Sequence, residues 1–303
     1  MRLFLGVDGG QSGTAAVIGE ETGRVLGRGE AGPCNHAAAG EGRAKLERAV
    51  AGSVAAACAE AGLDPATITF EAACFGMSGG PDDKREILAG MLRTGRLIVT
   101  TDAVTALAGA TESGQGIIVI AGTGSIAFGR NAKGKTTARA GGWGYIFGDE
   151  GGAFDIAREA LRAALRMEEG WGPPTRLREM LLEVTECRDA NEVLHLFYRD
   201  DWPRSRVASL APLVDAAAIA GDSVAAHILQ GAAQDLATLA ASVRAQLWTP
   251  ADAVEVAYIG GVFQSRTVLE RFRVLVELQE TDRCIAPLRG PAEGALLEAI
   301  RSV

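Results

Sequence analysis

Two short glycine-rich turns, each flanked by apolar strands, lie about a hundred residues apart in the chain. The first segment runs from Leu3 to Val17 around the turn 8–14 (DGGQSGT), and the second runs from Gly116 to Gly129 around the turn 122–125 (GTGS). In each segment an apolar strand enters a turn of glycines and small hydroxyl residues, and a second apolar strand leaves it, so backbone N–H groups are exposed at the tip. The chain is therefore predicted to contain a duplicated strand-turn-strand unit.

The exposed N–H groups of such turns bind anions. Two turns facing each other across a cleft would hold a polyphosphate from both sides, which suits a nucleotide better than a single phosphate. Either turn alone is more often a tight hairpin without a ligand, and it is the duplication that favours phosphate binding. Only the first turn contains an aspartate, Asp8, which could place Mg²⁺ while the second turn holds phosphate alone.

The composition excludes several classes of protein. The length of 303 residues predicts about two domains, and a hydrophobic content of 48% supplies ample core. A net charge of −8 without any basic run argues against a nucleic-acid partner. The apolar segment before Asp8 is too short for a signal peptide or a membrane span, so we expect a cytoplasmic protein with no membrane partner. Five scattered cysteines without a CxxC pair predict reduced thiols rather than disulfides or an iron–sulfur or zinc site.

Apolar periodicity predicts the element order βββαβαβα in both halves of the chain. In the first half, further strands are expected at 24–29, 70–75 and 97–101, and helices at 40–61, 82–92 and 102–110. In the second half, strands are expected at 117–120, 125–130, 136–140, 254–259 and 284–287. Short helices at 175–184, 190–198 and 206–220 would form an insert over about 168–220. This order predicts an α/β protein with an N-terminal domain at 1–110, completed by a C-terminal helix at 291–303, and a second domain at 111–290.

Further motifs accompany the two turns along nearly the whole chain. They are Asn35-His36, Ser78–Gly80, Thr100–Ala103, Gly141–Gly144 (GGWG), Gly148–Gly151 (GDEG), Tyr198–Asp200, Gly221-Asp222 and Gly260–Val262. With the paired turns, they resemble the actin, hexokinase and Hsp70 superfold and, within it, the N-acetylglucosamine kinases of the BadF/BadG/BcrA/BcrD-type ATPase family. The GGWG and GDEG blocks are the most specific of these motifs, because the first turn alone would identify only the superfold.

The resemblance implies duplicated actin-like ATPase domains of the ribonuclease H-like type, with an active-site cleft between them. It also implies an ATP- and Mg²⁺-dependent kinase that phosphorylates the 6-hydroxyl of N-acetylglucosamine. Such transfer needs in-line positioning, neutralised phosphate charge and a base for the acceptor hydroxyl. The expected partners are a small-molecule amino sugar and a second copy of the chain in a homodimer.

Phosphate and metal binding are assigned to the two turns. Asp8 follows a strand and precedes two glycines, so its carboxylate would hold Mg²⁺ directly or through water, and the alternative is a turn-capping aspartate. The amides and hydroxyls expected to contact the phosphates belong to Gly9, Gly10, Ser12, Thr123 and Gly124.

Asp102 is the predicted general base. It ends an apolar strand and begins a helix at the carboxyl edge of the first sheet, where ligands of open α/β sheets bind. The alternative is an N-cap for the helix 103–110, and both roles are compatible because a helix N-terminus stabilises an anion.

The acceptor sugar is expected to contact both halves of the chain. Asn35 follows the Gly32-Pro33 break on a loop and is preferred over the neighbouring His36 as a ligand, while Asp102 would contact the reacting hydroxyl. The Gly142-Trp143-Gly144 run could present a flat ring to a pyranose or an acetyl methyl, and the alternative is an ordinary core tryptophan.

Three further residues complete the predicted substrate side. The resemblance makes Asp149 a ligand of sugar hydroxyls, although Asp149 and Glu150 could instead cap the helix 153–166. Ser125, beside the second turn, is expected to reach the same sugar. On the adenine side, the resemblance puts the nucleoside against Ala218, Gly260 and Gln264, of which Gln264 departs from the family's side-chain type.

Other functions are left open by these motifs. Glucosamine and N-acetylmuramic acid differ from N-acetylglucosamine only at the C2 or C3 substituent, so a kinase for either is an alternative. A different class in the same family is the ATPase activator of 2-hydroxyacyl-CoA dehydratases, which needs bridging cysteines for an iron–sulfur cluster that this chain does not place suitably. A sugar sensor without turnover is disfavoured by the intact Asp102.

Overall fold

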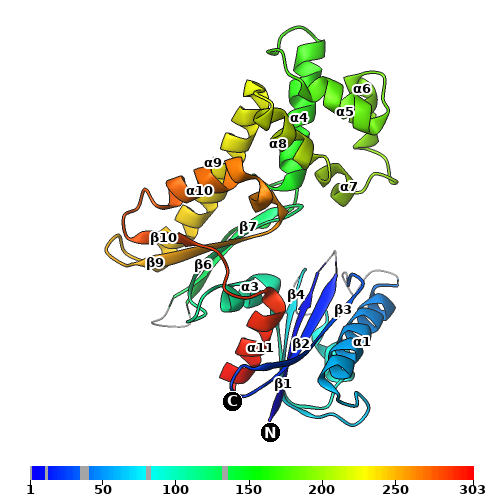
Figure 1. Ribbon diagram of the computed structural model, residues 1–303, viewed down its shortest axis with the longest axis vertical. Helices are drawn as coiled ribbons and strands as arrows, with labels where there is room; N and C mark the ends of the chain where they lie inside the picture. The colour runs from blue at the N-terminus through cyan, green and yellow to red at the C-terminus, as the bar shows by residue number, and fades with distance from the viewer. Residues whose placement is uncertain (1, 11–12, 35–40, 80–82, 132–135) are drawn as a thin grey trace. The chain divides into compact units, whose positions relative to one another are not determined.

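The computed structural model describes residues 2–10, 13–34, 41–79, 83–131 and 136–303. The chain forms two compact units, Met1–Gly116 with Pro287–Val303, and Ile117–Ala286. Each unit is built on a five-stranded sheet (Figure 1). Within the described residues, no helix combines the length and the apolar character that crossing a bilayer requires.

The sheet of the first unit has the order β3-β2-β1-β4-β5. Its central strand β1 (Leu3–Gly9) pairs antiparallel with β2 (Thr14–Glu20) and parallel with β4 (Phe70–Met77). The edge strands are β3 (Val25–Ala31) and β5 (Thr94–Thr101). The helices of this unit are α1 (Gly42–Ala61), α2 (Arg85–Ala89), α3 (Asp102–Ala110) and α11 (Pro291–Arg301).

Alternation along β1 explains how helices cover both faces of this sheet. Leu5 and Val7 belong to the core shared with α1, whereas Phe4 belongs to the core shared with α11. Figure 1 shows α1 on one face and α11 on the other. At Gly6 a Cβ atom would lie 2.2 Å from the backbone nitrogen of Leu296, so only glycine lets α11 approach the strand this closely. The C-terminal helix α11 is thereby packed against the N-terminal strand β1.

The second unit has the sheet order β10-β9-β6-β7-β8. Its strands are β6 (Gly116–Ala121), β7 (Ser125–Arg130), β8 (Thr137–Gly141), β9 (Val254–Ile259) and β10 (Asp282–Ile285). The helices between β8 and β9 are α4 (Ala153–Glu168), α5 (Leu177–Thr185), α6 (Ala190–Leu196), α7 (Arg204–Ala208), α8 (Ala211–Ile219) and α9 (Ser223–Leu247). A short 3-10 helix η1 (Gly261–Gln264) and α10 (Arg266–Val276) connect β9 to β10. The predicted α/β class and the repeated order of elements are confirmed.

Two predicted helices differ from the observed ones. The single helix expected at 206–220 is wrong, because the chain forms α7 and α8 with a break at 209–210. Pro212 has no N–H to donate to the carbonyl of Ala208, so α7 cannot continue through it and a new helix begins with proline in its first turn. The helix expected at 82–92 is shorter, since α2 ends at Ala89 before Gly90.

Candidate active site

Three polar residues of the first unit meet where parallel strands end. The register pairs Asp8 of β1 with Gly76 of β4, and Gly76 with Thr100 of β5. Ser78 and Asp102, each two residues further on, therefore follow their strands at the same edge of the sheet. The side chains meet there, because Ser78 Oγ donates a hydrogen bond of 2.6 Å to Asp102 Oδ2. This edge is the position at which open α/β sheets bind ligands.

Asp102 is held from two sides. Its Oδ1 accepts a 2.9 Å hydrogen bond from the N–H of Ala103, in addition to the bond from Ser78 to Oδ2. Asp102 is the first residue of α3, and the N-cap position belongs to Thr101. The alternative of Asp102 as the N-cap is therefore wrong by one position, although its carboxylate still lies in the first turn, where the helix dipole favours an anion.

Asp8 lies at the end of β1 in an environment that disfavours its charge. Burial and, to a smaller extent, the nearby negative charge of Asp102 together raise the pKa of the Asp8 carboxyl from 3.8 to about 7. A carboxylate in such a place is stabilised by a cation. Asp8, with Asp102 nearby, fits Mg²⁺, which is commonly held by one or two carboxylates together with phosphate oxygens and water.

The first turn is closed by its own backbone. The Gly10 N–H donates to the Gly13 carbonyl at 2.9 Å, and the Ser78 N–H donates to the Gly9 carbonyl at 3.0 Å. A Cβ atom on Gly9 would lie 2.6 Å from Met77 Sδ and 2.7 Å from Cys34 Sγ, so a larger residue here would have to displace these side chains. The Gly10 N–H, which is expected from the sequence to contact phosphate, thus donates its hydrogen bond within the turn itself. Two predicted site residues, Ser12 and Asn35, lie outside the described residues, as does the neighbouring His36.

The second turn is supported by the start of α4. The N–H groups of Ala153 and Phe154 donate to the carbonyls of Gly122 and Thr123 at 2.8 and 3.1 Å. In the part of the chain that the structure describes, the N–H groups of Thr123 and Gly124 donate to no protein acceptor. The turn therefore offers two adjacent amides of the kind that bind phosphate oxygens.

Asp149 lies directly behind the second turn. It is only 5% exposed and has a positive φ of 65°, which is unusual for a residue with a side chain. Its Oδ1 accepts the N–H of Ser125 at 3.3 Å, and its Oδ2 accepts Arg204 Nη2 at 2.6 Å. The N-cap of α4 is Gly152, without a side-chain cap, so the alternative in which Asp149 or Glu150 caps this helix is wrong.

Arg204, at the start of α7, is the partner that the sequence analysis did not identify. Its guanidinium carbon lies 5.0 Å from the ring centre of Tyr145 and 5.8 Å from that of Phe154. Arg204 and Asp149 are 55 positions apart, and α7 belongs to the helical insert. No periodicity or motif links them, because only the tertiary fold brings the insert to this carboxylate.

Trp143 presents its ring to solvent. Its side chain is 64% exposed, and the guanidinium carbon of Arg139 lies 4.9 Å from the ring centre. The flanking Gly142 and Gly144 have φ values of +73° and +79°, which a larger residue would adopt only under strain. The alternative of a core tryptophan is therefore wrong. Ser125, by contrast, is buried, and its Oγ donates to the Glu150 carbonyl at 2.6 Å.

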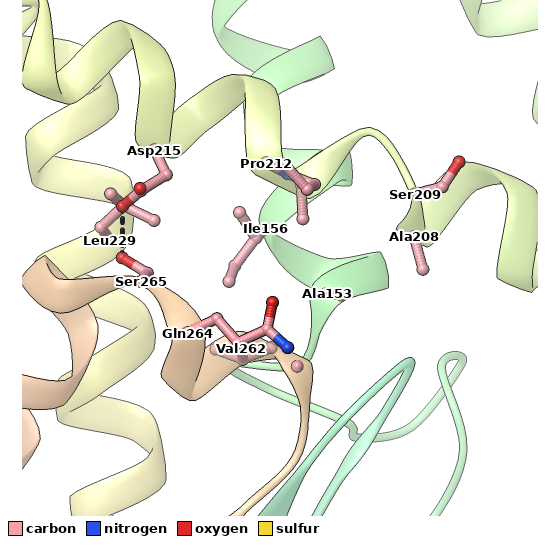
Figure 2. A pocket seen from close by; sticks show the side chains of 12 residues that line it. Ala153, Ile156, Ala208, Ser209, Pro212, Asp215, Leu229, Val262, Gln264 and Ser265 are labelled. Atoms are coloured by element: carbon pink, nitrogen blue, oxygen red, sulfur yellow. Dashed lines mark hydrogen bonds between the residues drawn. The ribbon is translucent and has the colours of Figure 1, made fainter.

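A cavity of about 420 Å³ lies within the second unit, among α4, α8 and η1. Figure 2 shows Asp215 and Ser265 joined by a hydrogen bond, and Gln264 projecting into the same space. Gly260 precedes η1 with a φ of +116°, and a Cβ atom there would lie 2.2 Å from the Ala121 carbonyl oxygen. Of the residues predicted for the adenine side, Gln264 lines the cavity. Ala218, further along α8, does not line it.

Comparisons with known proteins cover from two thirds to nearly all of the chain. The family model of the BadF/BadG/BcrA/BcrD ATPases matches residues 5–299. The chain is 37% identical over 213 residues to the N-acetylmuramic acid/N-acetylglucosamine kinase of Clostridium acetobutylicum, covering 68% of this chain and 69% of that protein. It is 29% identical over 319 residues to the N-acetyl-D-glucosamine kinase of Dictyostelium discoideum, covering 99% and 98%.

A solved structure shows the same architecture. The structure of a candidate N-acetylglucosamine kinase from Chromobacterium violaceum matches 98% of both chains with a TM-score of 0.79 and 30% identity. The predicted duplicated actin-like fold is thereby confirmed.

Proposed function

The chain belongs to the BadF/BadG/BcrA/BcrD ATPase family, and we propose that it transfers the γ-phosphate of ATP to the 6-hydroxyl of N-acetylglucosamine. The kinase relatives, one of them matching nearly the whole chain, support a phosphotransferase whose acceptor is a hydroxyl group of a sugar. The observation that carries the proposal is the pair of carboxylates at one sheet edge, Asp8 with its pKa raised by burial and Asp102 held by Ser78 and α3. Phosphoryl transfer to an alcohol needs a metal ligand and a base of this kind.

In this proposal each unit has its own task. Asp102 accepts the proton of the sugar hydroxyl, and Asp8 holds Mg²⁺, which when bound neutralises charge on the phosphates. The free amides of Thr123 and Gly124 bind phosphate oxygens. Asp149, behind the second turn, accepts hydrogen bonds from sugar hydroxyls, and the exposed ring of Trp143 packs against the apolar face of the sugar.

An assay of ADP release tests the proposed function. Purified protein with ATP and Mg²⁺ is expected to release ADP rapidly with N-acetylglucosamine and at a much lower rate without sugar. The 6-deoxy analogue lacks the acceptor hydroxyl and should bind without being phosphorylated. ADP release that does not depend on any amino sugar would contradict the proposal and favour the activator of the same family. The cysteines give that activator no support, because Cys34, Cys58, Cys74 and Cys284 are buried thiols in the cores.

Ser78 is expected to act through Asp102. Because the Ser78 hydroxyl fixes Asp102 Oδ2, Ser78→Ala should lower kcat by about 10-fold while the KM for sugar and ATP changes little. The same substitution made in an Asp102→Asn background should have almost no further effect, since residues that act as a unit are not additive. Ser78→Thr, which keeps a hydroxyl, should recover much of the rate. Additive effects in steady-state kinetics would show that Ser78 does not position the base.

Asp215 is expected to bind the nucleoside. Its Oδ1 is held by Ser265 Oγ, and the structure gives its Oδ2 no partner among the described residues. This oxygen can accept an O–H or N–H from a nucleoside in the cavity, so Asp215→Ala should raise the KM for ATP about 10-fold with kcat nearly unchanged. Ser242→Ala, on the exposed face of α9, is the matched control. Equal KM values for ATP in the two variants would exclude Asp215 from the nucleotide site.

A further inference from the structure

The segment 143–151, called the sugar segment below, contains Trp143 and Asp149, the two side chains of the second unit that the proposed function places against the sugar. The segment contains neither helix nor strand. Gly144, Asp149 and Gly151 have φ values of +79°, +65° and +73°, so its backbone turns sharply at several points. Because it lacks a regular hydrogen-bond ladder of its own, the sugar segment depends on contacts from other elements to keep its shape.

Two side chains of α4 hold the sugar segment near both of its ends. The Oδ2 atom of Asp155 accepts the N–H of Gly151 at 3.0 Å, and its Oδ1 atom accepts a hydrogen bond from Arg158 Nη2. Arg158 Nη1 in turn donates to the Tyr145 carbonyl in a longer bond of 3.4 Å. Asp155 is buried, which shields its bonds from competing water. The ion pair therefore links two distant points of the sugar segment to one helix.

The same turn of α4 supports the second phosphate turn. The N–H groups of Ala153 and Phe154 donate to carbonyls of that turn, and Asp155 is the next residue along the helix. The first residues of α4 thus hold both the proposed sugar ligands and the proposed phosphate ligands of this unit. Phosphoryl transfer depends on the alignment of acceptor and phosphate, and a displacement of about 1 Å can cost 10²-fold in rate.

The surroundings of Asp155 give Arg158 an electrostatic role. Both residues line a cavity of about 340 Å³, whose other lining residues include three acids, Glu150, Glu159 and Asp235. Burial, and after it the negative charges of Asp155 and the two glutamates, raise the pKa of Asp235. Without Arg158, the Asp155 carboxylate would face these like charges with no ion-pair partner on its own helix. The pair therefore offsets repulsion that would otherwise weaken the hold on Gly151.

We propose that Asp155 and Arg158 are positioning residues that align the sugar hydroxyl with the γ-phosphate. This inference rests on the proposed function and concerns the accuracy of transfer at the same site. Both residues act through the sugar segment. If the segment loosens, a bound sugar presents its hydroxyl out of line, whereas an attacking water molecule is not held by this segment. Loss of the pair should therefore slow transfer to sugar and leave the slow hydrolysis of ATP by water unchanged.

The test measures sugar phosphate formation and sugar-free ATP hydrolysis in matched glutamine variants. In Arg158→Gln, kcat for N-acetylglucosamine should fall about 10-fold, and the sugar-free rate should stay within about twofold of wild type. Arg162 forms an ion pair with Glu159 one turn further along α4, so Arg162→Gln is the control and should retain both rates. Arg158→Lys should recover part of the loss, because one ammonium can bond Asp155 but lacks the fork that also reaches the Tyr145 carbonyl.

A second variant keeps the test decisive if Arg158→Gln is unstable. Asp155→Asn has the shape of the carboxylate without its charge and should show the same selective loss, and the double variant should be no worse than either single one. Equal losses of both rates, with a lower melting temperature, would overturn the inference by showing that the pair supports only the fold. Wild-type rates in both variants would also overturn it and leave the proposed function intact. A wild-type enzyme whose ADP release does not respond to sugar would refute the proposed function and this inference together.

Discussion

Replacing Asp102 with asparagine is expected to lower kcat by about 10²- to 10⁴-fold while the affinity for sugar changes by only a few-fold. The amide has the shape of the carboxylate, and its oxygen can still accept one of the hydrogen bonds from Ser78 and the Ala103 amide. It cannot accept the proton of the sugar hydroxyl. The loss should therefore appear in the chemical step and not in binding, as measured by single-turnover kinetics and by sugar titration.

Two further variants make this result specific. Asp102→Glu keeps a carboxylate but moves it by one methylene, so it should also be impaired because a base out of line loses the benefit of positioning. Asp64→Asn, at an exposed position before β4, is the matched control and should retain wild-type turnover. An Asp102→Asn enzyme that kept a tenth of the wild-type rate would show that Asp102 only stabilises the start of α3.

The strand ends could be predicted from the sequence because each is marked by an abrupt local change. The observed bounds of β7, β9 and α3 agree with those expected, since apolar runs end there at glycine, at a polar turn or at a helix-starting aspartate. Parallel strands bring their carboxyl ends together, so the expectation that Asp8 and Asp102 both lie at the edge of the first sheet followed from the element order alone.

The contacts that orient these groups could not be predicted in the same way. Ser78 belonged to a motif, but its bond to Asp102 depends on the register between β4 and β5. Arg204 reaches Asp149 from an insert whose helices follow no repeat, and Asp215 reaches Ser265 from 50 positions away. Pro212 is visible in the sequence and marks the break between α7 and α8. The apolar periodicity of 206–220 nevertheless predicts one helix, because periodicity does not register that proline lacks a backbone N–H.

Asp8→Asn is expected to have opposite effects on stability and on catalysis. The pKa of Asp8 is about 7 in the folded chain and 3.8 ordinarily, so between these values the folded chain holds a proton that the unfolded chain has released. The stability contributed by this proton is fully present below pH 3.8 and is lost as the pH rises through 7. Without metal, the asparagine variant should therefore melt at a higher temperature than wild type at pH 8, and the difference should vanish near pH 4.

The activity of the same variant should fall steeply. Without the carboxylate, kcat/KM for ATP with Mg²⁺ should fall by about 10²- to 10³-fold and require a higher Mg²⁺ concentration, because the cation loses a charged ligand. Added Mg²⁺ with a non-hydrolysable ATP analogue should stabilise wild type more than Asp8→Asn at pH 8, which reverses the order of melting temperatures seen in EDTA. If the melting temperatures of the two proteins differ by the same amount from pH 5 to 9, with and without Mg²⁺, then Asp8 carries neither the proton nor the metal. The reversal distinguishes a metal ligand from a turn-capping aspartate, since the loss of a cap would lower stability at every pH and in both conditions.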